Sequence, residues 1–86
     1  MGHYIVLDTS AEHRRMALLD EAAALHVAQA VDDVPPVGIA LSGAAASLGR
    51  TTLCCVETGK SFPVDFQLVG ATYRPVFQQL HRSTDP

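Results

Sequence analysis

The segment of residues 9–31 has the most regular apolar pattern in the chain, and it most restricts the fold class. Its apolar residues recur at spacings of three and four, the period of an amphipathic helix: Met16, Leu19, Ala23, Val27 and Ala30. Thr9 and Glu12 form a Thr-x-x-Glu capping box before this pattern, and Pro35-Pro36 follow it. The sequence therefore predicts one long helix that ends near Val31.

Strand-like runs lie on either side of the predicted helix. Residues 3–7 form a short apolar run, typical of an interior strand that is covered on both faces. Val37, Ile39 and Leu41 alternate with small residues, as in a second strand. A strand, a long helix and another strand form a βαβ unit, in which the two strands are parallel.

A hairpin is predicted over residues 51–57 and 61–69, with Gly59 in the turn. If Glu57 lies opposite Lys60, Cys55 pairs with Phe62, and one face of the hairpin belongs to the core. That core face consists of Leu53, Cys55, Phe62, Val64, Phe66 and Leu68. The semi-polar face consists of Thr52, Cys54, Val56, Asp65 and Gln67. Pro63 has no N–H to donate, which predicts a free sheet edge along the second strand.

The last element is a short C-terminal helix, since apolar residues recur there at helical spacing: Tyr73, Val76, Phe77 and Leu80. The predicted fold is therefore α+β, in the order β-α-β-β-β-α. A four-stranded mixed sheet carries the long helix on one face. A chain of 86 residues is too short for two cores, so residues 1–82 form a single domain and residues 83–86 a frayed tail.

Charge and cysteine content narrow the function classes. Six Lys and Arg stand against nine Asp and Glu, whereas domains that bind nucleic acid electrostatically are usually strongly basic. The chain has no run of about 18 apolar residues, so no transmembrane segment is expected. Cys54 and Cys55 are adjacent and point to opposite faces of a strand. Two free thiols favour a reducing, cytoplasmic location.

No set of residues has the spacing of a catalytic or metal site. The four histidines, His3, His13, His26 and His81, lack any metal-ligand pattern. Asp8 ends a predicted strand, where catalytic groups often lie, but a helix cap explains it equally. Cys54 would need a nearby His to act as a nucleophile. We therefore expect no enzyme activity, no cofactor and no metal.

An alternative function is small-ligand or phosphate binding by the loop that contains Gly43, Gly49, Arg50 and Thr51. The loop departs from a phosphate-binding motif in its glycine spacing, in having Arg for Lys, and in preceding a strand. A further alternative is weak nucleic-acid contact through an arginine patch, composed of Arg14, Arg15, Arg50 and Arg74.

The leading hypothesis is a small protein-binding module without enzyme activity. Arg14 and Arg15 lie in the first turns of the predicted helix, where cations oppose the helix dipole, so we expect them to face a partner. The other predicted contacts lie on the hairpin: Cys54, Val56, Asp65 and Gln67. Such a module could act as an adaptor, an immunity or antitoxin-like protein, or a phage-type inhibitor of a bacterial defence complex. The predicted free edge also suggests a homo-oligomer.

Overall fold

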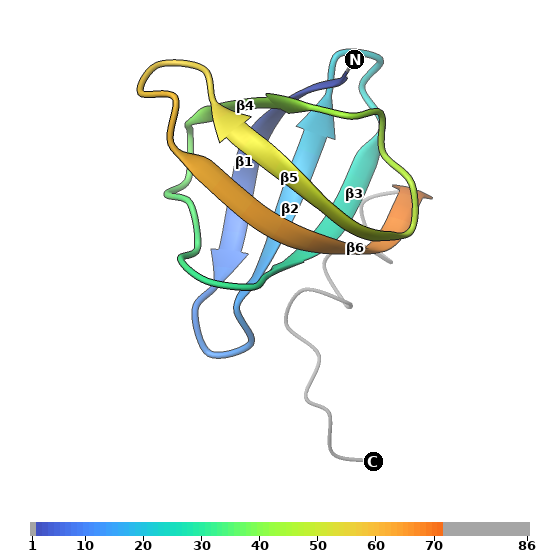
Figure 1. The fold of residues 1–86 in the computed structure, drawn as a ribbon. Coiled ribbons are helices and arrows are strands. Elements are labelled where there is room, and N and C mark those ends of the chain that lie inside the picture. The colour runs from blue at the N-terminus through green and yellow to red at the C-terminus, as the bar shows by residue number, and fades with distance from the viewer. Residues whose placement is uncertain (1, 72–86) are drawn as a thin grey trace.

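The computed structural model describes residues 2–71, and every regular element within them is a β-strand. The strands are β1 (Gly2–Ser10), β2 (Arg15–Asp20), β3 (Leu25–Ala30), β4 (Ala40–Gly43), β5 (Gly49–Cys55) and β6 (Ser61–Ala71). Neighbouring strands are antiparallel, in the order β1-β2-β3-β6-β5-β4, and β1 also pairs with β4 (Figure 1). The fold is thus a closed barrel of two three-stranded meanders, and the α+β prediction is wrong.

The predicted long helix is replaced by two hairpins. Residues 9–31 contain the end of β1, all of β2 and β3, and the two turns between them. Arg14 and Ala23 have φ angles of 55° and 65° in these turns, a left-handed conformation that helices exclude. The carboxylate of Asp20 stabilises the second turn, because its Oδ1 accepts hydrogen bonds from the N–H groups of Ala22 and Ala24, both at 2.9 Å.

Apolar residues on both faces of β2 and β3 explain the misleading helical period. Met16 and Leu18 point into the barrel, whereas Ala17 and Val27 are buried in a second, outer cluster with Leu25 and Leu68. The residues matched at spacings of three and four therefore came from both faces and from a turn. Neighbouring strands override the high helix propensity of Ala here.

The predicted hairpin and its turn are confirmed. Gly59 has a φ of 77°, and its N–H donates to the carbonyl of Cys55 at 2.8 Å. The register is shifted by two residues from the predicted one, since Leu53 rather than Cys55 pairs with Phe62. A shift of two preserves the alternation of faces, and only Leu68 departs from the predicted core face, at an irregularity in the pairing with β3.

The predicted free edge of the hairpin is wrong. β6 pairs with β5 on one side and with β3 on the other. Pro63 is tolerated because it lies just beyond Val64, the residue that pairs with Ala30 at the end of β3. The Pro63 carbonyl accepts a hydrogen bond from the Val31 N–H at 3.0 Å. Closure of the barrel thus leaves β6 no free edge for strand addition.

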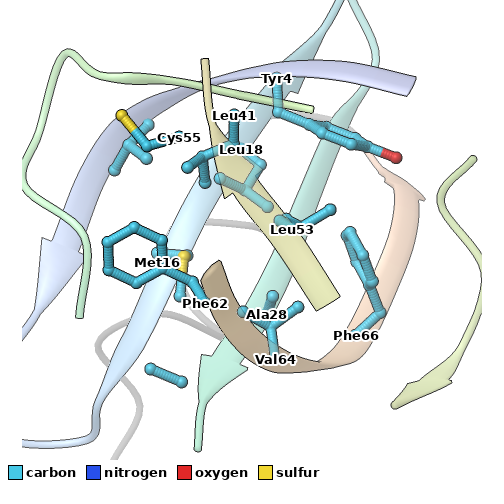
Figure 2. Packing of buried hydrophobic residues seen from close by; sticks show 12 residues of the cluster. Tyr4, Met16, Leu18, Ala28, Leu41, Leu53, Cys55, Phe62, Val64 and Phe66 are labelled. Atoms are coloured by element: carbon cyan, nitrogen blue, oxygen red, sulfur yellow. The ribbon is translucent and has the colours of Figure 1, made fainter. Parts of the chain in front are cut away.

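The core fills the interior of the barrel, as Figure 2 shows. Its buried members are Tyr4, Val6, Met16, Leu18, Ala28, Ala30, Leu41, Leu53, Cys55, Phe62, Val64 and Phe66. Five of the six residues predicted for the core face of the hairpin are among them; Leu68 instead packs against the outer cluster. The predicted C-terminal helix and frayed tail, and the end of the proposed domain, lie outside the described residues.

Candidate functional site

The outer side of β1 carries large apolar side chains that the barrel does not cover. Alternation along the strand turns Tyr4 and Val6 inward and Ile5 and Leu7 outward. Exposed fractions are 41% for Ile5, 43% for Leu7, 56% for Val37 and 60% for Val56. The prediction of a strand covered on both faces therefore fails for its outer residues. We call the surface formed by Ile5, Leu7, Leu19, Val37, Ala40 and Val56 the apolar face.

Strand pairing makes the apolar face continuous. Ile5 is the register partner of Leu19 on β2 and of Ala40 on β4. The Val56 N–H donates to the Ala40 carbonyl at 3.0 Å, which brings the end of β5 beside β4. Val37 precedes Gly38, whose N–H donates to the Val6 carbonyl at 2.7 Å, so the segment that contains Val37 runs beside β1.

An open hollow of about 180 Å³ lies at one end of this face. Ile5, Leu19 and Ala40 line it from three adjacent strands, and the buried residues Tyr4 and Leu41 also contribute to its lining. Its accessible lining is mainly apolar. The hollow can therefore hold an apolar group, but it offers few hydrogen-bonding partners.

The buried imidazole of His26 connects the end of β2 with the end of β6, at one end of the barrel. The N–H of Gly70 donates to His26 Nδ1 at 3.0 Å, so this nitrogen carries no proton. The other nitrogen, Nε2, therefore donates to Asp20 Oδ2 at 2.8 Å. This hydrogen bond, followed by those from the backbone of Ala24 and Ala22, holds the pKa of Asp20 below its ordinary value.

The same geometry argues against His26 as a general base. Both ring nitrogens are already bonded, and the ring packs edge-on against Tyr4 and Phe66, with centroids 5.9 and 6.1 Å away. Tyr4 donates its hydroxyl to the Ala44 carbonyl at 2.8 Å. Burial, then the Asp20 and Glu21 carboxylates, raise the pKa of Tyr4, so its phenol stays protonated. We interpret this group as structural.

The two arginines predicted to face a partner have different environments. Arg14 is exposed, but its Nη2 donates to the carbonyls of Val31 and Asp32, which ties the β1–β2 hairpin to the segment after β3. Arg15 is half-buried on the outer side of β2, where it is the register partner of Gln29. Neither belongs to the apolar face.

The four predicted contact residues of the hairpin are also divided. Val56 belongs to the apolar face, and Cys54 lies beside Ser61, with Sγ and Oγ 3.7 Å apart. Asp65 and Gln67 lie on the outer side of β6, where Gln67 Nε2 donates to Gln29 Oε1 at 2.7 Å. Only Val56 among the six predicted partner residues therefore belongs to this site.

Sequence reasoning missed the other five members of the site: Ile5, Leu7, Leu19, Val37 and Ala40. The alternation of Ile5 and Leu7 with Tyr4 and Val6 is visible in the sequence, but alternation does not show which face of a strand is covered. The signal that could have found them is the pair of apolar faces on the first strand, combined with a fold that has no helix to cover the outer one.

The glycine loop has no helix after it. Gly43 ends β4, while Gly49, with a φ of 109°, begins β5, the strand that also contains Arg50 and Thr51. A side chain at Gly43 would meet Leu53 Cδ2 at 2.7 Å, so strand packing alone explains this glycine. The loop therefore lacks the helix N-terminus that makes phosphate loops effective, and anion binding stays a prediction without a built site.

The described residues contain no group of three or more His, Cys, Asp and Glu side chains that could hold a metal ion. Both cysteines are free thiols. The hydroxyl and N–H of Thr58 lower the pKa of the buried Cys55 thiol.

Comparisons with known proteins add no family: no family model, curated protein or solved structure matches the chain. Within residues 2–71 no helix is long and apolar enough to cross a membrane. The candidate site thus depends on the geometry of the barrel.

Proposed function

We propose that this protein is a small protein-binding module without enzyme activity, and that it docks its apolar face on a larger protein. The observation that carries the proposal is the exposure of four large apolar side chains on neighbouring segments: Ile5, Leu7, Val37 and Val56. An adaptor, an immunity or antitoxin-like protein, and a phage-type inhibitor of a bacterial defence complex all work by this kind of docking.

The physical reason is the hydrophobic cost of exposing such a surface. Each square ångström of apolar surface removed from water stabilises a complex by about 25 cal/mol before the costs of association. Isolated apolar residues are common on protein surfaces, but contiguous apolar patches typically mark interaction sites. The barrel has already filled its interior, so these side chains do not contribute to its core.

One part of the proposal changes because the barrel is closed, and one part is kept. β6 is paired on both sides, so self-association by strand addition along this strand is not proposed. We keep the cytoplasm as the proposed location, because both cysteines are free thiols, as expected in a reducing compartment.

The test compares the full chain with two double variants that gain the same charge. Ile5→Glu with Val56→Glu places two carboxylates on the apolar face. Ala11→Glu with Thr52→Glu places them at exposed positions elsewhere, as a matched control. Each tagged protein captures its partners from a lysate of the native host for mass spectrometry. A size measurement and a thermal melt check the state of each bait.

We expect at least one partner protein to bind both the natural chain and the control variant. The same partner should not bind the apolar-face variant. Equal retention by the apolar-face variant, with unchanged folding, contradicts the proposed docking surface. If no protein is retained specifically by the natural chain, the proposed function itself is wrong.

A further inference from the structure

The hollow on the apolar face has the size of one aromatic ring. Its volume is about 180 Å³, whereas an apolar cavity of about 150 Å³ accommodates a benzene molecule. Ala40 contributes to this space because its side chain is smaller than that of Ile5, its register partner on β1. The hollow therefore has room for a group about as large as one aromatic side chain.

Negative charge lies at the β2 end of the hollow. Asp20 and Glu21 both line it, and the three hydrogen bonds to Asp20 favour its ionised form. Both carboxylates contribute to the raised pKa of Tyr4 in the lining, which is consistent with a negative potential there. The exposed imidazole of His3 also lines the hollow, but the described lining residues include no Lys or Arg.

From this combination we infer the chemistry of the partner's anchor, an inference that rests on the proposed function. We propose that the hollow receives one aromatic side chain of a partner protein, and that a Lys or Arg adjacent to it in the partner contacts Glu21 and Asp20. Binding hot spots often consist of an aromatic anchor in a pocket, and the rim of an interface is typically polar. The apolar residues outside the hollow then exclude water around this anchor.

Capped dipeptides test the anchor without knowledge of the partner. The probes are N-acetylated, C-terminally amidated Phe-Lys, Phe-Glu and Ala-Lys, titrated into the full ¹⁵N-labelled chain at low salt. Phe-Lys should shift the amide signals of Leu19, Glu21 and Ala40 with millimolar affinity. Phe-Glu should bind about threefold more weakly, because exposed ion pairs contribute only modestly. Ala-Lys should cause no saturable shift.

Two substitutions connect binding to the hollow. Ala40→Leu fills the space and should abolish the Phe-Lys shifts, whereas Ala11→Leu adds the same volume at an exposed site in the β1–β2 turn and should not. Glu21→Gln should reduce the preference for Phe-Lys over Phe-Glu. Spectra of the free variants show whether each keeps the barrel fold.

Three outcomes of the dipeptide titrations overturn the inference. These are absence of saturable Phe-Lys shifts at the hollow, equal affinity for Phe-Lys and Phe-Glu, and binding that survives Ala40→Leu in a folded variant. A concentration-dependent dimer that Ala40→Leu dissociates would identify a second copy as the occupant, and would also contradict it. If the dipeptides fail while the capture experiment succeeds, only the anchor is wrong and the apolar face remains the docking surface.

Discussion

Replacement of Asp20 by Asn tests how much the hydrogen-bond network around His26 stabilises the barrel. The Asn Oδ1 can still accept from the N–H groups of Ala22 and Ala24, but its amide presents a donor to His26 Nε2. The imidazole cannot relieve this by changing tautomer, because Nδ1 would then present a proton to the Gly70 N–H. Either way, one buried donor loses its acceptor.

The expected cost follows from the bonds that are lost. A hydrogen bond to a charged group contributes about 1.5–3 kcal/mol, and a buried unsatisfied donor costs about 1–3 kcal/mol. These two figures describe largely the same loss, so we expect Asp20→Asn to lower the free energy of unfolding at neutral pH by about 2–3 kcal/mol. Urea denaturation measures this change, and Glu21→Gln, an exposed neighbour, should stay within about 0.5 kcal/mol of the natural chain.

The pH dependence gives a second, independent check. Because the folded pKa of Asp20 is lowered, first by His26 and then by the Ala24 N–H, its stabilising effect is complete above the unfolded pKa. That effect is lost as the pH falls through the folded value. The stability difference between Asp20→Asn and the natural chain should therefore be constant near neutrality and shrink below about pH 4. A difference under about 0.5 kcal/mol at neutral pH refutes the reasoning, as does one that does not shrink in acid.

Three further predictions concern the turns and the core. Ala23→Gly should raise the free energy of unfolding by about 0.4–1 kcal/mol, and with it the midpoint of thermal unfolding, because Ala23 has a φ of 65°. If Ala23 were helical, the same substitution would lower both. Leu53→Ala should cost about 2–5 kcal/mol in urea denaturation, while the exposed Leu48→Ala should change little. Thr58→Val should raise the pKa of Cys55, because the Thr58 hydroxyl is the main group that lowers it. The absorbance of the thiolate, recorded against pH in a Cys54→Ser variant, measures this pKa. An unchanged pKa contradicts the role of the hydroxyl.

Local chemistry made one part of the fold predictable. The turn between β5 and β6 has a positive φ at Gly59, which a residue without a side chain adopts readily. Alternation along Phe62, Val64 and Phe66 indicates the core face. These signals lie within a few residues of the contacts they determine. The predicted register was wrong by two residues because the turn is longer than expected. Cys55 rather than Glu57 lies opposite Lys60, and the Gly59 N–H donates to the Cys55 carbonyl within the turn.

The region that failed, residues 9–31, depends on contacts between segments that are distant in sequence. Its turns use Arg14 and Ala23 at positive φ, residues for which neither composition nor spacing predicts such a conformation. Arg14 is held there by the carbonyls of Val31 and Asp32, and Asp20 holds the second turn. The capping box and the alanines are visible in the local sequence. The pairing with neighbouring strands, which outweighs their helix propensity, is not.

The same dependence explains why the candidate site was not predicted. Ile5 and Leu7 were assigned to a strand covered on both faces because both faces of residues 3–7 are largely apolar. Without the predicted helix, alternation sends Tyr4 and Val6 to the core and leaves Ile5 and Leu7 exposed. The site therefore depends on the barrel topology. In a closed barrel the outer residues of β1 face away from the core, beside Ala40 and Val56. A surface of this kind follows from the topology, and so a substitution there should affect docking far more than folding.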